Sequence, residues 1–105
     1  MIAVEKLEEI LARGEDSALL RFALGAEYLK AGEPDKAVQH LGVAVTIDPD
    51  YSAAWKLLGK GQGEAGLAEA ARETYRKGIE AATRRGDRQS AKEMEVFLKR
   101  LEKLG

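Results

Sequence analysis

The sequence predicts an all-α fold, an antiparallel helix-pair solenoid of about two and a half repeats with a C-terminal capping helix. Three observations lead to this prediction. Apolar residues recur three and four positions apart along almost the whole chain, which is typical of amphipathic helices. Glycine, proline and aspartate interrupt that pattern and leave only short connections, so neighbouring helices must run antiparallel. The chain also resembles itself when it is shifted by 34 residues.

The interruptions divide the chain into six expected helices. The first stops at Gly14, and the second follows Asp16 and Ser17, two residue types that cap helix N-termini. Pro34 suits the first turn of the third helix, because proline there lacks an N–H that would be unpaired anyway. The expected helices run from 2 to 13, from Ser17 to near Gly32, from Pro34 to about Ile47, from 51 to 65, from near Leu67 to about Arg84, and from Asp87 almost to Gly105.

The internal repeat places identical residues at helix contacts and turns. The identical pairs are Leu24 and Leu58, Gly25 and Gly59, Ala31 and Ala65, Gly32 and Gly66, and Ala37 and Ala71. Glycine inside a helix costs ~1 kcal/mol relative to alanine. We therefore expect that a neighbouring helix approaches Gly25 and Gly59 too closely for a Cβ atom, with Ala37 and Ala71 as the small residues on the facing helices.

These residues resemble the tetratricopeptide repeat, whose signature is Trp-x2-Leu-Gly-x2-Tyr, then Ala-x3-Phe, then Pro. The first copy reads Leu24-Gly25-x2-Tyr28, Ala37-x3-Leu41 and Pro49, with Arg21 in the usual aromatic position. The second copy reads Trp55-x2-Leu58-Gly59 and Ala71-x3-Tyr75, and it departs from the signature at Gln62 and Thr83. The resemblance covers about residues 2–85 and is to the small bacterial type of such proteins.

The chain has room for one domain, residues 1–105. We divide it into a half repeat at about 2–16, repeats at about 18–51 and 52–85, and a capping helix at about 87–104. The apolar stripe of this last helix comprises Ala91, Met94, Phe97 or Leu98, Leu101 and Leu104. A helix with one apolar and one charged face covers the apolar end of a repeat stack. The alternative for this stripe is a dimer seam.

Composition argues against an enzyme. The chain has no cysteine and one histidine, His40, which excludes thiolate and multi-histidine metal sites. Residues 61–66 match the G-x-G-x-x-G fingerprint, but they follow an expected helix, whereas nucleotide binding needs a preceding strand. We expect no catalytic residue, no cofactor and no metal, and we expect His40 to be a surface residue.

The charge distribution limits the classes of partner. The net charge is −1, so no global field attracts nucleic acid or a membrane. Residues 1–71 carry seven basic and twelve acidic side chains, and residues 72–105 carry ten basic and six acidic ones. The basic cluster comprises Arg72, Arg76, Lys77, Arg84, Arg85 and Arg88. Because no aromatic residues interleave with it, a nucleic-acid accessory role is the weaker alternative.

The N-terminal residues and the apolar runs predict a cytoplasmic location. Glu5, Glu8 and Glu9 lie where a signal peptide needs an apolar core. The longest apolar run is far shorter than the ~18 residues that a membrane span requires. The sequence leaves open whether this chain is part of a longer repeat array.

The resemblance implies that the first helix of each repeat lines a concave groove that holds a peptide or helix of a partner. The candidate groove residues are Leu19, Phe22, Ala26 and Leu29 on the second helix, and Lys56 and Lys60 on the fourth. The alternative for Leu19 and Phe22 is packing on the first helix. We predict a non-enzymatic protein-interaction module of unidentified partner. Self-association through the last helix or the groove is the alternative.

Overall fold

The computed structural model describes residues 4–104. Its helices are α1 (Val4–Ala12), α2 (Ala18–Lys30), α3 (Pro34–Ile47), α4 (Ser52–Glu64), α5 (Ala68–Arg85) and α6 (Arg88–Leu104). No strand occurs between residues 4 and 104, which confirms the predicted all-α class. The expected bounds agree closely with these helices, although the expected start of the first helix at residue 2 lies outside the described residues.

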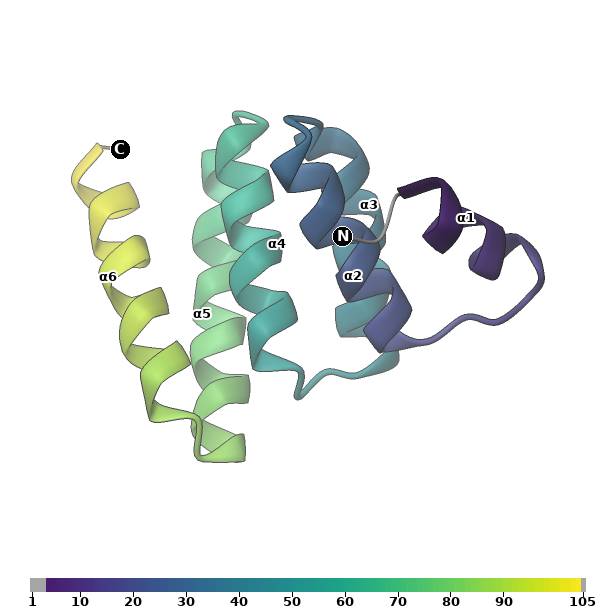
Figure 1. Ribbon diagram of the computed structural model, residues 1–105. Coiled ribbons are helices and arrows are strands. Elements are labelled where there is room, and N and C mark those ends of the chain that lie inside the picture. The colour runs from purple at the N-terminus through teal and green to yellow at the C-terminus, as the bar shows by residue number, and fades with distance from the viewer. Residues whose placement is uncertain (1–3, 105) are drawn as a thin grey trace.

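The helices form an elongated stack of 41 × 28 × 22 Å. In Figure 1, α2 lies in front of α3 and α4 lies in front of α5, so that two antiparallel pairs stand side by side. Helix α1 packs along α2 at one end of the stack, and α6 packs along α5 at the other. This arrangement is the helix-pair solenoid that the repeat predicts.

Close approaches at glycines hold each helix pair together. A Cβ atom on Gly25 would overlap the side chain of Leu41, and one on Gly59 would overlap the ring of Tyr75. Ala37 and Ala71 are fully buried, as the sequence predicts. A third close approach was not predicted. A Cβ atom on Gly78 of α5 would lie 2.8 Å from the Cβ of Trp55 and would also meet the sulfur of Met94.

Two capping residues fix the starts of α2 and α6. The Ser17 hydroxyl oxygen accepts a hydrogen bond from the Leu20 N–H at 3.0 Å. Asp87 accepts one from the Ser90 N–H at 3.1 Å and another from the Ser52 hydroxyl at 2.7 Å. The bond from Ser52, followed by those from Ser90, lowers the pKa of Asp87 to about 2. Since Ser52 begins α4, this carboxylate ties the start of α6 to the start of α4.

The apolar stripe of α6 packs within its own chain. Met94 is fully buried in a cluster with Ala71, Tyr75 and Ala82. Ala91, Phe97, Leu98 and Leu101 pack against this cluster and are partly buried. This packing leaves Val96, 47% exposed, and Leu104, 85% exposed, as the large apolar residues on the outside of α6. Within residues 4–104, none of the helices combines the length and the apolar character that crossing a membrane requires.

Candidate functional site

The prediction for His40 was wrong, because its side chain is only 12% exposed. Its ring stacks on the ring of Tyr28, with centroids 5.5 Å apart and planes 6° apart. The Nδ1 atom lies 3.1 Å from Nη1 of Arg21, and Arg21 in turn donates to both carboxylate oxygens of Asp16 at 2.9 Å. Burial lowers the pKa of His40, while the nearby charge of Glu8 opposes this shift. The ring is enclosed by Tyr28 and Arg21 of α2 and by Glu8 of α1, which comes within 3.9 Å.

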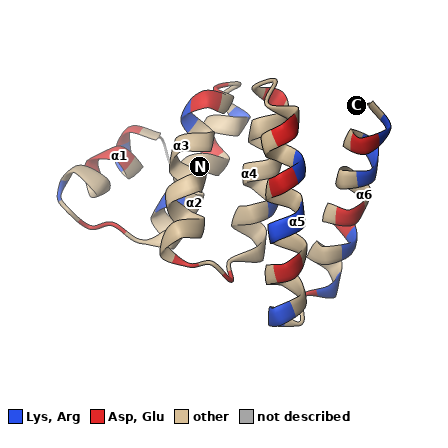
Figure 2. Ribbon diagram, turned by 180° about the vertical axis from the view of Figure 1, so that it is seen from behind, with Lys and Arg blue, Asp and Glu red and all other residues tan. Residues whose placement is uncertain are grey.

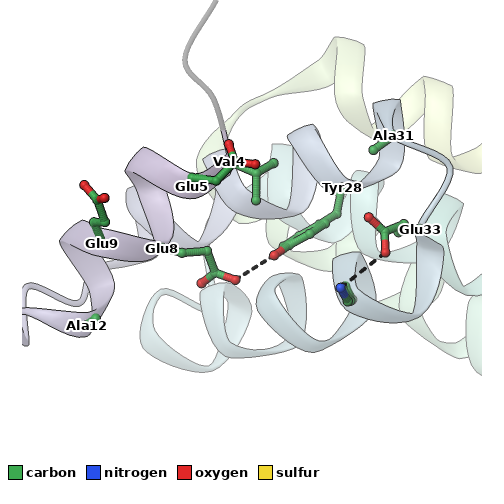
Figure 3. Close-up of a pocket in the computed structure, with 9 residues that line it drawn as sticks. Val4, Glu5, Glu8, Glu9, Ala12, Tyr28, Ala31 and Glu33 are labelled. Atoms are coloured by element: carbon green, nitrogen blue, oxygen red, sulfur yellow. Dashed lines mark hydrogen bonds and ion pairs between the residues drawn. The ribbon is translucent and has the colours of Figure 1, made fainter.

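A hollow of about 680 Å³ lies between α1 and the turn from α2 to α3 (Figure 3). Four glutamates line it, Glu5, Glu8, Glu9 and Glu33. Glu8 accepts a hydrogen bond from the Tyr28 hydroxyl at 2.6 Å, and Glu33 pairs with Lys36 at 3.3 Å. Residues 4–104 contain no group of three side chains placed to hold a metal ion. Two of the four carboxylates are therefore occupied by contacts within the chain.

Two further hollows lie along the face that α2, α4 and α6 share. The first, here called the α2–α4 hollow, has a volume of about 210 Å³ and is lined by Ala26, Leu29, Lys30, Leu57 and Lys60. The second, here called the α4–α6 hollow, has a volume of about 470 Å³ and is lined by Gly59, Lys60, Gly63, Glu64, Tyr75, Phe97, Arg100 and Leu101. Lys60 lines both, so the two hollows adjoin. We call the surface that contains them the α2–α4–α6 face.

The structure gathers three of the six candidate groove residues in one hollow. Ala26, Leu29 and Lys60 all line the α2–α4 hollow. The other three candidates, Leu19, Phe22 and Lys56, do not line this hollow. The ring of Phe22 stacks on that of Tyr51 with centroids 5.0 Å apart.

The remaining two candidates have different surroundings. Leu19 is 69% exposed near the start of α2. The ammonium group of Lys56 is 2.7 Å from a carboxylate oxygen of Glu93 on α6. This ion pair connects α4 to α6, so Lys56 already has a partner within the chain.

Sequence reasoning missed the α4–α6 hollow. Its far wall comes from Phe97, Arg100 and Leu101 of α6, and Tyr75 of α5 also lines it. The repeat register supplies Tyr75 but could not supply the three positions on α6, because α6 has no clear equivalent in the other repeats. One signal was present, since Phe97 and Leu101 belong to an apolar stripe larger than a lid alone needs.

The α4–α6 hollow has an apolar interior and charged groups at its edge. The rings of Tyr75 and Phe97 have centroids 5.6 Å apart and are tilted by 45°. Burial, followed by the charge of Glu64, raises the pKa of Tyr75 to about 12, so its hydroxyl is neutral at physiological pH. The Arg100 guanidinium lies 5.9 Å from the centre of the Phe97 ring, within range of a cation–π contact.

Much of the basic cluster contacts acidic or carbonyl oxygens of the same chain. Arg84 binds the Asp50 carboxylate at 3.0 Å, and Arg85 donates to the Asp50 backbone oxygen at 3.1 Å. Arg72 pairs with Glu69, and Arg76 lies 3.6 Å from both Glu73 and Glu102. Figure 2 shows the resulting mixture of basic and acidic positions along α5 and α6. This mixture does not form the continuous positive surface that nucleic acid favours.

A stack of antiparallel helix pairs with a shared face of hollows defines the class of helical repeat proteins. The family model described as Tetratricopeptide repeat matches residues 3–61. A TPR repeat-containing protein from Pseudomonas aeruginosa is 49% identical over 100 residues, which cover 95% of each chain. The chain therefore belongs to the tetratricopeptide repeat family.

Solved structures share this fold along most of the chain. The solution structure of a protein from Bordetella parapertussis has a TM-score of 0.83 and 45% identity, and the match covers 98% of this chain and 90% of that one. The crystal structure of a tetratricopeptide repeat domain protein from Salinibacter ruber has a TM-score of 0.79 and 29% identity, with 86% and 100% covered. A heat-shock protein cognate co-chaperone from Aspergillus fumigatus is 32% identical over 77 residues, which are 73% of this chain but 23% of the co-chaperone.

Proposed function

We propose that this protein is a non-enzymatic protein-interaction module that holds a peptide or helix of a partner along the α2–α4–α6 face. The observation that carries the proposal is that Lys60 lines both hollows, which makes them neighbouring parts of one surface. Concave sites with mostly apolar walls and a few charged groups are typical of ligand recognition. Apolar burial would supply most of the affinity, and the charges would select the partner.

The relatives support the class of function and do not specify the partner. The co-chaperone from Aspergillus fumigatus is named for its action with another protein, the heat-shock protein cognate. Members of the family that hold acidic chaperone tails use a set of lysine, asparagine and arginine side chains along the groove. Phe22 and Ala26 of this chain do not match that set. For this reason we do not extend that ligand to this protein.

The test is capture of partners from the native cell extract by three immobilised forms of the protein. The wild type and Lys77→Glu should retain equal amounts of the same partner, and Lys60→Glu should retain less of it. Both lysines are exposed, so the two variants carry the same charge reversal and should both fold. Only Lys60 lines the hollows, whereas Lys77 lies on α5. If all three forms retain the same proteins in equal amounts, the α2–α4–α6 face is not the binding surface.

A further inference from the structure

We propose that the α4–α6 hollow is the anchor site of the α2–α4–α6 face. It takes one large apolar side chain, aromatic or branched, from a partner peptide whose adjacent residues are acidic. This inference rests on the proposed function and adds to it where the partner is held and which residue types are held.

The hollow exists because α4 presents glycines there. Gly59 and Gly63 are one helical turn apart, and both line the hollow. With no side chain at either position, Tyr75 of α5 lines the same space. Phe97 and Leu101 of α6 form the opposite wall. Figures 1 and 2 both show α6 diverging from α5 toward its C-terminal end, which is where these two residues lie.

Gly63 has no role in packing that requires glycine. Gly59 must be glycine because of the Tyr75 ring, and at Gly61 a Cβ would be 3.3 Å from the Val38 side chain. At Gly63 a Cβ would meet nothing within 4 Å, and its φ is not in the left-handed region. Glycine disfavours a helix more than any residue except proline. Its presence at 63 therefore weakens the helix without relieving a clash, while it keeps the hollow open.

The charges at the edge of the hollow favour an acidic partner. Between residues 4 and 104, neither Lys60 nor Arg100 has a carboxylate within 4.0 Å, whereas Lys56 pairs with Glu93. The lining of the hollow thus holds two cations and one carboxylate, Glu64. An apolar anchor flanked by acidic residues complements both the interior and the edge. The anchor should dominate, since exposed ion pairs contribute little.

The experiment is a titration of ¹⁵N-labelled protein with three acetylated pentapeptides, followed by amide chemical shifts. The first peptide has a phenylalanine with two glutamates on each side, the second replaces the phenylalanine by alanine, and the third replaces the glutamates by glutamines. The first should shift the amides of Gly59, Gly63 and Arg100. The alanine peptide should bind at least about tenfold more weakly, and the glutamine peptide about two- to fivefold more weakly.

Two protein variants locate the site. Gly63→Leu should fill the hollow and weaken binding of the phenylalanine peptide at least about tenfold, without lowering the melting temperature. Gly42→Leu on α3 is the matched control, because a Cβ atom there also meets nothing within 4 Å and Gly42 lines neither hollow. It should leave binding unchanged.

Several outcomes would overturn the inference. Equal binding of the phenylalanine and alanine peptides, equal binding to Gly63→Leu, or no shift at the hollow residues would each do so. If Lys60→Glu still reduces capture from the extract in those cases, the proposed function stands and only the anchor site is wrong. Sedimentation tests whether a second copy of the chain occupies the hollow instead of a peptide. If the wild type is a dimer and Gly63→Leu is a monomer, a second copy fills the hollow and the inference is wrong.

Discussion

At the scale of single residues, a departure from the repeat signature has a structural consequence. Arg21 stands where the signature has an aromatic residue, and its guanidinium bridges Asp16 before α2 and His40 on α3. His40 stacks on Tyr28, and the Tyr28 hydroxyl donates to Glu8 on α1. A polar network thus replaces part of the expected apolar contact where α1 meets the first repeat.

The partly buried position of His40 predicts that acid destabilises the fold through this residue. Its pKa is lowered by burial and by Arg21, against the opposing charges of Glu8 and Asp16. Above the unfolded value of about 6.5, both states are neutral and the packing of His40 is fully present. As the pH falls below that value, the unfolded state takes up the proton first, so stability decreases. Thermal melts at pH 7, 6 and 5 should show a larger decrease for the wild type than for His40→Gln. Parallel curves for the two proteins would contradict this.

The glycines of α4 predict opposite effects for the same substitution. Gly63→Ala should raise the free energy of unfolding by up to about 1 kcal/mol, because the helix gains and nothing clashes. Gly59→Ala should lower it by about 1–3 kcal/mol, because the Tyr75 ring must move. Urea denaturation of the two variants measures both values. A loss of stability in Gly63→Ala would mean that the position has a packing role that its open surroundings do not indicate.

At the scale of the helices, α6 should be essential for stability. A chain that ends after Arg85 would uncover Tyr75, Gly78 and Ala82 on α5, which α6 now covers. Each lost contact of a large side chain is worth ~1.5–3 kcal/mol, against a total of ~5–15 kcal/mol for a domain. The shortened chain should aggregate or melt more than about 10 °C lower than the full chain. Circular dichroism and light scattering measure these two outcomes.

Asp87→Ala should weaken the attachment of α6 less than the removal of the whole helix does. It removes the cap of α6 and the bond to Ser52 but leaves the apolar stripe intact. Its melting temperature should lie between those of the full and the shortened chains. A shortened chain that stays soluble and melts like the full one would show that α6 does not cap the stack and would favour a dimer seam instead.

The sequence was sufficient to predict those features of the fold that depend on residues close together in the chain or on the internal repeat. The close approaches at Gly25 and Gly59 could be predicted, because each glycine has its counterpart one repeat away. The groups that meet these glycines are the side chains of Leu41 and Tyr75, whereas Ala37 and Ala71 were expected there. The α4–α6 hollow could not be predicted from the sequence. Its shape depends on how α6 diverges from α5, and α6 lies outside the repeat register. His40 was misplaced because the groups that enclose it lie on other helices, Tyr28 and Arg21 on α2 and Glu8 on α1.

At the scale of the whole molecule, the two ends of the stack are held differently. Helix α6 is attached to α4 by the Ser52–Asp87 hydrogen bond and the Lys56–Glu93 ion pair, and its own residue Met94 is fully buried. Helix α1 packs along α2, and Leu7 is the buried residue of its described part. In a repeat protein each element is stabilised by its immediate neighbours. The two ends should therefore open with different free energies.

Amide hydrogen exchange should show this difference directly. We expect the amides of α1 to exchange faster than those of α2 to α6, because α1 has fewer neighbours that must separate before it opens. Tyr28→Phe removes the hydroxyl that binds Glu8, so exchange in α1 should accelerate further while exchange in α5 stays unchanged. The Glu8 bond also raises the pKa of Tyr28 to about 12, so the stability that this bond contributes is fully present below about pH 10 and is lost as the pH rises from about 10 to about 12. Equal protection of α1 and α5, or equal acceleration of both in Tyr28→Phe, would mean that the stack opens as a single cooperative unit.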